Sequence, residues 1–374
     1  MSVEQLPILQ NKFKRVSTVP ERSENPIIKV DGLAYTIVGR SDLDKAEQFY
    51  NDFGLITASK TSSAFYLKGV GEDPCLVVVR KQKKDQVIGL GLRANTEEEL
   101  NHLANVHGKN LQTAEYPGGG KYITLTDPDG VVVEVIAGQT PVTPVEVKGS
   151  HAEEAAFNNP KEKGRVNKIV RFPAKPANIY RIGHTAFSGK DITKTLPWYL
   201  DNFGFIVSDF EFADGVETPL IAFVRCDRGD KPTDHHTMGI GAAINVGHLH
   251  TAFEVKNFDA VGSSGDWLRQ QGYKQSWGVG RHTLCSAVFD YWRDPWDTLY
   301  EHYTDCDVFD NTVPTGYHGL DAHAQHQWGP TMPKDMIDVS LKRAPALIGT
   351  LVKRLATEKE FTLSNLKKIL KAVS

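Results

Sequence analysis

Three side chains in the second half of the sequence could together hold a divalent metal ion: His184, His250 and Glu301. Each lies in a run typical of a strand, where alternation puts Glu301 on one face with Leu299 and Tyr303. A carboxylate inside a sheet needs a partner. Two neutral imidazoles and one carboxylate form a facial triad that binds a divalent metal and leaves coordination positions open, as in non-haem Fe(II) oxygenases. The sequence therefore predicts a metal centre suited to oxygen chemistry.

Strands must position these ligands, and the carboxylate comes from a strand-turn-strand unit. Residues 286–292 and 298–303 are rich in aromatic and β-branched types, and Asp294-Pro295 between them is a turn signal. The two histidines fall in two earlier predicted strands, within 180–189 and 248–255. The three ligands would thus meet only if these strands share one sheet.

The strands belong to a pattern that occurs four times. Each copy has one strand, one amphipathic helix and three further strands, and the copies cover 33–82, 87–138, 180–242 and 248–304. The predicted fold class is α+β, with two domains that each contain a pair of βαβββ modules. We predict an N-terminal arm at 1–30, domains at 31–145 and 179–310, a linker at 146–178, and a lid with a helical tail at 311–374.

The two halves align with each other, and the alignment separates them by function. Tyr35 of LAYTIVG falls on His184, and Glu134 falls on Glu301. Residues 87–92 contain no histidine where His250 would fall. A lone carboxylate cannot hold a metal, so the N-terminal half is predicted to be structural and the C-terminal half catalytic.

The composition is that of a globular protein that acts on a small molecule. The 374 residues are 40% hydrophobic and 24% charged, and the formal net charge of -3 argues against a nucleic-acid partner. The four cysteines lack C-x-x-C spacing, so neither a disulfide framework nor a zinc site is indicated. No run approaches the ~20 apolar residues of a membrane span, and the N-terminus carries no apolar signal segment. We therefore expect a cytoplasmic protein without an integral membrane segment.

The end of the chain is first polar and then basic. His318, His323 and His326 lie in a loop-like run, 311–333, that could cover a pocket as a lid. Residues 334–374 combine helical apolar spacing with an excess of Lys and Arg, which favours packing on an acidic neighbouring subunit over an anionic membrane surface. We therefore expect a homo-oligomer.

The motifs GHTAF, DHHTMGIG, GHLHTAFEV, GRHTL and DYWRDPWDTLYEHY occur in this order along the chain. They resemble the type I extradiol ring-cleaving dioxygenases of the vicinal oxygen chelate superfamily, and the resemblance covers residues 31–305. It implies Fe(II), or alternatively Mn(II), held by His184, His250 and Glu301. It also implies a catechol-type substrate, cleaved with dioxygen in the catabolism of aromatic compounds.

The same resemblance assigns roles to three further residues. His236 matches the acid-base histidine of the family, while His282 and Tyr291 match residues that would stabilise oxygen anions. Cys285 stands where some members carry an acidic residue, which is a departure from their pattern.

Other features keep alternatives open. A group of arginines near the motifs could bind a substrate carboxylate: Arg225, Arg281 and Arg293. A metal-dependent lyase, isomerase or hydrolase of the same superfamily would use the metal as a Lewis acid without consuming oxygen. A small-molecule-binding protein of the resistance type would not need the complete triad together with His236.

Overall fold

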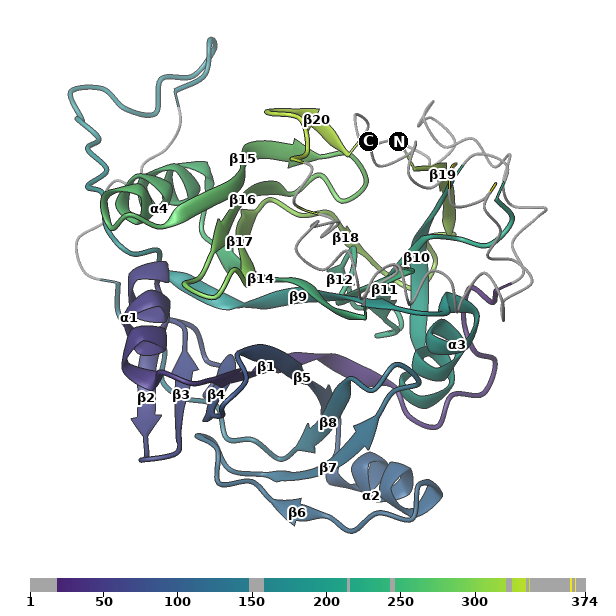
Figure 1. Cartoon of the computed structure of the whole chain (residues 1–374). Helices are drawn as coiled ribbons and strands as arrows, with labels where there is room; N and C mark the ends of the chain where they lie inside the picture. The colour runs from purple at the N-terminus through teal and green to yellow at the C-terminus, as the bar shows by residue number, and fades with distance from the viewer. Residues whose placement is uncertain are drawn as a thin grey trace.

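The computed structural model describes most of the chain, namely residues 19–147, 158–213, 216–242, 246–320 and 325–333, with 336, 364 and 367. Two curved mixed β-sheets lie one above the other in Figure 1, and β1 of one sheet runs beside β9 of the other. Helices α1 and α4 pack together at one end of this junction (Figure 1).

The N-terminal sheet contains eight strands in the order β2-β3-β4-β1-β5-β8-β7-β6. Its two βαβββ units join where their first strands, β1 and β5, pair antiparallel. Helix α1 (Leu43–Phe53) begins at the cap Asp42 and ends at Gly54, whose φ of 115° favours glycine. The other elements are β1 (Val30–Arg40), β2 (Ile56–Lys60), β3 (Ala64–Lys68), β4 (Val77–Lys81), β5 (Gln86–Ala94), α2 (Glu97–Val106), β6 (Gln112–Thr113), β7 (Lys121–Thr126) and β8 (Val132–Ala137).

The C-terminal sheet contains ten strands in the order β19-β10-β11-β13-β9-β14-β17-β16-β15-β20. It repeats the two βαβββ units and adds an edge strand at each end. The elements are β9 (Ile179–Gly189), α3 (Ile192–Phe203), β10 (Phe205–Phe212), β11 (Ile221–Cys226), β13 (Met238–Ala242), β14 (Gly247–Val255), α4 (Phe258–Gln270), β15 (Lys274–His282), β16 (Val288–Arg293), β17 (Leu299–Thr304), β19 (Gly316–Gly319) and β20 (His326–Trp328). A separate pair is formed by β12 (Thr233–Asp234) and β18 (Val308–Phe309).

The predicted fold class is confirmed, because both sheets consist of paired βαβββ units. The domain boundaries themselves stay a prediction. Within the described arm, residues 19–29 form no helix or strand of a sheet, although Val19 and Ile28 are buried. No helix in the described part of the chain is long and apolar enough to cross a membrane.

Two predictions about local structure were wrong. Residues 311–333 are not simply loop-like, since 316–319 pair with β10 and 326–328 pair with β15. The residue pattern of 235–242 predicts a strand that would include His236, but β13 begins only at Met238, so His236 lies before it. The predicted helical tail at 334–374 lies, except for three residues, outside the described residues.

Candidate metal centre

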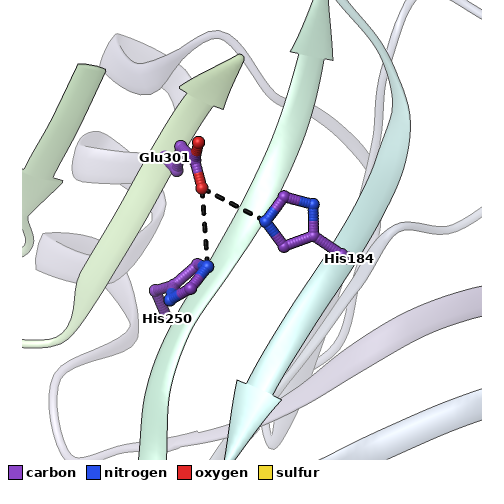
Figure 2. A group of neighbouring side chains, drawn as sticks. All are labelled: His184, His250 and Glu301. Carbon is purple, nitrogen blue, oxygen red and sulfur yellow. Dashed lines mark ion pairs between the residues drawn. The ribbon is translucent and has the colours of Figure 1, made fainter. Parts of the chain in front are cut away.

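The three predicted metal ligands lie on three neighbouring strands of the C-terminal sheet. His184 is on β9, His250 on β14 and Glu301 on β17, with β14 between the other two. Ala252 of β14 lies opposite both His184 and Glu301, and His250 is two residues earlier on the same face. Figure 2 shows the three side chains converging.

The distances between the ligand atoms suit one metal ion. Oε2 of Glu301 lies 3.2 Å from Nε2 of His184 and 3.5 Å from Nε2 of His250. One ligand atom from each residue lies within 4.8 Å of the others. Metal ligands about 2.0–2.2 Å from a shared ion are themselves roughly 3 Å apart, so little movement would be needed to bind one.

The protonation states of the ligands also suit a metal. Burial lowers the pKa of both His184 and His250 to about 3, so each imidazole is neutral and can offer a lone pair. Nε2 of His250 and both carboxylate oxygens of Glu301 are buried and have no hydrogen-bond partner among the described residues. Unpartnered buried polar atoms are costly, and one divalent cation would satisfy all three. The residues therefore fit a metal.

His282 and Tyr291 lie beside this triad and contact each other. Nε2 of His282 is 2.9 Å from the Tyr291 hydroxyl and 3.8 Å from Oε1 of Glu301. On the other side of the ring, Nδ1 lies 3.2 Å from the carbonyl oxygen of Gln325. Burial lowers the pKa of His282, so the ring is neutral and its Nδ1–H donates to that carbonyl. Nε2 then accepts the hydroxyl proton of Tyr291.

His236 also lies beside the triad. It sits in the bend between β12 and β13, and its ring centroid is 4.1 Å from that of His184. Phe223 contacts the same ring, with 5.1 Å between centroids. Burial lowers the pKa of His236 well below its usual value, so the ring is neutral. It is close enough to act on a molecule bound at the centre.

The N-terminal half holds the turn that precedes the Glu301 strand. Arg40 of β1 forms an ion pair with Asp294, Nη2 to Oδ2 2.6 Å, and both side chains are fully buried. The same guanidinium donates to the Thr298 hydroxyl at 2.7 Å. The predicted turn at Asp294-Pro295 is therefore hydrogen-bonded to the N-terminal half of the molecule.

The N-terminal half also contacts the outer face of β17. The Tyr300 hydroxyl lies 2.6 Å from that of Tyr50, and Nε2 of His302 lies 2.8 Å from the carbonyl oxygen of Phe53. Because side chains alternate along a strand, these contacts leave Glu301 on the opposite, inner face. The predicted face of Glu301, shared with Leu299 and Tyr303, agrees with this arrangement, since His302 points to the other side.

The three arginines predicted as substrate-binding candidates are engaged with other groups. Arg225 donates to the Ser208 hydroxyl at 2.9 Å and to the Val313 carbonyl at 2.7 Å. Arg281 pairs with Asp305 at 2.8 Å, and Arg293 donates to the Asp297 carbonyl at 3.0 Å. Cys285 is buried beside Ala252 and Tyr303.

The histidines of the predicted lid have different environments. His318 is buried on β19, with Nε2 2.7 Å from Oδ1 of Asp209. His326 lies on the edge strand β20, and His323 lies outside the described residues. The lid itself stays a prediction. It gains support from Gln325, whose side chain donates to Glu211 at 2.7 Å while its carbonyl contacts His282.

Sequence reasoning missed two buried carboxylates, Asp209 and Glu211, on the inner side of β10. Asp209 lies opposite Phe223 in the strand pairing, and Phe223 contacts His236. A signal was present, because FIVSDFEF places two acidic residues in a strand that is otherwise almost entirely apolar and is buried throughout. Acidic side chains are rarely buried without a partner, so the two acidic residues of this strand indicated a functional role.

Comparisons with known proteins agree with this geometry. Residues 181–307 match the model of the Glyoxalase/Bleomycin resistance protein/Dioxygenase superfamily. Metapyrocatechase 2 of Cupriavidus necator is 26% identical over 300 residues, which cover 78% of this chain and 87% of that protein.

Two solved structures share the fold. The Mn(II)-bound glyoxalase from Novosphingobium aromaticivorans has a TM-score of 0.67 at 20% identity, covering 82% of this chain and 93% of that one. The homoprotocatechuate 2,3-dioxygenase of Brevibacterium fuscum, in an anaerobic complex with 3,4-dihydroxyphenylacetate, has a TM-score of 0.67 at 20% identity and covers 84% and 94%. Residues 181–307 thus resemble this superfamily, and the chain shares the two-domain fold of an extradiol dioxygenase structure.

Proposed function

We propose that this protein cleaves the ring of a catechol-type aromatic with dioxygen, outside the two hydroxyl groups, at a non-haem Fe(II) centre, with Mn(II) as the alternative metal. One observation carries the proposal. Nε2 of His250 and both carboxylate oxygens of Glu301 are buried without partners among the described residues, and with neutral His184 beside them they form a facial triad. The likeness to ring-cleaving relatives supports the same chemistry.

The metal, when bound by His184, His250 and Glu301, would hold the two catechol oxygens and supply the open position for dioxygen. The residues around the metal would then accept and donate protons. A catechol that chelates a metal through both oxygens releases one or both of its hydroxyl protons. We propose that His236, a neutral imidazole packed on His184, takes one of these protons and later returns it.

His282 and Tyr291 would act on negative charge that develops on oxygen. The Tyr291 hydroxyl and Nε2 of His282 share one hydrogen bond of 2.9 Å within reach of the triad. The Gln325 carbonyl holds the His282 ring by its other nitrogen. A proton placed on this pair can be donated to an oxygen anion without reorganising the pocket.

Oxygen consumption tests the proposal. Protein loaded anaerobically with Fe(II) is mixed with a panel of catechols, and oxygen uptake is followed together with the product mass. We expect one O₂ consumed per catechol, with both of its atoms in a ring-opened acid. Product formation without oxygen uptake would instead indicate a lyase, isomerase or hydrolase. Stoichiometric binding without turnover would indicate a small-molecule-binding protein.

A further inference from the structure

Glu211 of β10 is a buried carboxyl whose hydrogen bonding is incomplete. One oxygen, Oε1, accepts a hydrogen bond from the side-chain amide of Gln325 at 2.7 Å. The residue is 2% exposed, and the other oxygen, Oε2, is buried without a hydrogen-bond partner among the described residues. A buried carboxyl oxygen without a partner is costly, so Oε2 is available to a hydrogen-bond donor that enters the site.

Glu211 lies on the same face of the C-terminal sheet as the metal ligands. Directly paired residues of neighbouring strands point to the same side of a sheet. Glu211 pairs with Ile221, and Ile221 pairs with Gly241. Gly241 in turn pairs with Ser188, which is four residues after His184 on β9 and therefore shares its face. Because the sheet is curved, β10 and β15 lie on opposite sides of the ligand strands in Figure 1, and Glu211 faces the interior between them.

Gln325 connects Glu211 to the surroundings of the metal centre. Its side chain bonds to Glu211, while its carbonyl oxygen lies 3.2 Å from Nδ1 of His282. Nε2 of the same imidazole lies 3.8 Å from Oε1 of Glu301. A single glutamine thus spans the distance between Glu211 and a residue that borders the triad. A ring bound at the metal can therefore direct a substituent towards Glu211.

The strands between Glu211 and the triad carry small residues on this face. Gly239 and Gly241 of β13 have no side chain, and Ala186 of β9 pairs with Gly239. A side-chain carbon at Gly239 would lie 3.1 Å from that of Ala186 and 3.9 Å from the ring of Phe223. At these two positions β13 contributes no side chain to the face, which suits a flat aromatic ring lying over it.

The charges around Glu211 favour a cation at Oε2. The amide of Gln325 is neutral, and His318, which pairs with Glu211 from β19, is bonded through Nε2 to Asp209 at 2.7 Å. Burial raises the pKa of Glu211 to about 7, so the carboxyl is largely ionised at a slightly higher pH. A buried carboxylate is stabilised by a cation and repels a second anion.

We propose that Glu211 is a specificity-determining residue that binds a protonated amine on the ring substituent of the catechol. The inference rests on the proposed function, because it takes a catechol as the molecule bound at the metal. It makes aminoalkyl catechols the preferred substrate class and disfavours catechols whose substituent ends in a carboxylate. The nearby arginines that could bind a carboxylate are engaged with other groups: Arg225, Arg281 and Arg293.

The binding of three catechols tests the inference. The protein is loaded with Zn(II), which has no redox chemistry, and dissociation constants are measured by calorimetry at pH 8 without oxygen. The ligands are 4-(2-aminoethyl)catechol, 4-ethylcatechol and 3,4-dihydroxyphenylacetate. We expect the amine to bind at least about tenfold more tightly than the ethyl compound, and the acid to bind most weakly. Glu211→Gln keeps the size of the side chain, so the preference for the amine should fall below about twofold while the affinity for 4-ethylcatechol stays within about twofold of the parent value.

Glu134→Gln is the matched control, because it removes a buried carboxyl of the other sheet and should keep the parent preference. Equal binding of the amine and the ethyl compound by the parent, or an unchanged preference in Glu211→Gln, would overturn the inference. If Glu211→Gln does not fold, the comparison of ligands in the parent still decides. Selective binding of the amine without oxygen uptake by the Fe(II)-loaded protein would refute the proposed function alone. Oxygen uptake with no preference among the catechols would refute this inference alone.

Discussion

The two halves of the molecule contain the same site in two chemical forms. In the C-terminal sheet, Ala252 lies opposite His184 and Glu301. In the N-terminal sheet, Gly91 takes that central position and lies opposite Tyr35 and Glu134. The sequence alignment of the two halves is therefore matched by the strand register. What differs is how each buried carboxylate is satisfied.

The N-terminal half supplies its carboxylate with protein groups. Arg80 pairs with Oε1 of Glu134 at 3.0 Å, and the hydroxyls of Tyr35 and Tyr116 both donate to Oε2 at 2.9 Å. Gly91 makes room, because a side-chain carbon there would lie 2.4 Å from the Tyr35 ring. An internal cation and two hydroxyls take the place of a metal. Among the described residues, no lysine or arginine pairs with the C-terminal carboxylate of Glu301, which leaves it available to a metal.

The residue beside each carboxylate site differs in the same way. Thr185 follows His184, and Thr36 follows the equivalent Tyr35. The backbone N–H of Thr185 donates to the carbonyl of Thr237, and the N–H of Thr36 donates to that of Leu76. Thr237 and Leu76 are therefore equivalent, and so are the residues before them, His236 and Cys75. Burial raises the pKa of the Cys75 thiol to about 12, so it cannot exchange protons near neutral pH. The C-terminal half therefore has an acid-base group at this position, whereas the N-terminal half has a core residue.

The largest effect should come from removing the C-terminal carboxylate. Glu301→Ala should abolish both metal retention and turnover, because two imidazoles alone leave the triad incomplete. Elemental analysis of the purified protein measures this. Glu134→Gln is the matched control in the other half and should keep about one metal per chain. Metal retained by Glu301→Ala, or lost from Glu134→Gln, would reverse the comparison.

Removing the acid-base group should separate metal binding from turnover. His236→Gln keeps a similar size and hydrogen-bonding capacity but cannot shuttle protons, so kcat should fall by ~10²–10⁴. Iron content and anaerobic catechol affinity should stay near the parent values. Loss of iron would make His236 a ligand, and near-parental turnover would make it a bystander.

The contact between the halves should matter most for stability. Arg40→Met leaves Asp294 buried without its cation, which should lower the free energy of unfolding by about 3–5 kcal/mol. Denaturant unfolding measures the change. Arg40→Met/Asp294→Leu, which removes both charges, should recover most of the loss. If the double variant showed no recovery, lost packing and not the uncompensated charge would account for the loss of stability.

The internal cation of the N-terminal site should contribute less, because the Arg80 side chain is 34% exposed. Arg80→Met leaves Glu134 with only its tyrosine hydrogen bonds and should cost about 2–3 kcal/mol of unfolding free energy. Metal content should not change. A gain of metal by the N-terminal site, detected as a second ion per chain, would show that Arg80 alone excluded it.

The smallest effect should come from the buried carboxyl of Glu211, and it depends on pH. Glu211 is hydrogen-bonded to the amide of Gln325, and burial raises its pKa to about 7. A raised folded-state pKa favours the protonated form, so its contribution to stability is present below the ordinary pKa near 4.5 and is lost as the pH rises through 7. Glu211→Gln should therefore reduce the fall in unfolding free energy between pH 5 and pH 8 by about 2 kcal/mol. An identical pH profile in the variant and the parent would show that Glu211 is already ionised at pH 5.

Much of this protein could be predicted from the sequence. The fourfold βαβββ pattern, the turn at Asp294-Pro295 and the inward orientation of Glu301 all follow from local periodicity, which depends on the alternation of side chains along strands. The pairing of Tyr35 with His184 and of Glu134 with Glu301 could also be found, because the two halves kept the same motif order. These are properties of residues near one another in the chain.

Only the tertiary structure decided which distant groups satisfy each buried polar atom. Nothing near Glu134 in the sequence shows that Arg80 and Tyr116 would neutralise it, and nothing near Asp209 shows that His318 would return to it from more than a hundred residues away. His318 was therefore assigned to a polar loop, although it is buried on β19. Such partners come from the order of strands in a sheet and from edge strands added at its ends. Local periodicity determines which face a side chain takes, whereas the long-range pairing of strands determines what it meets there.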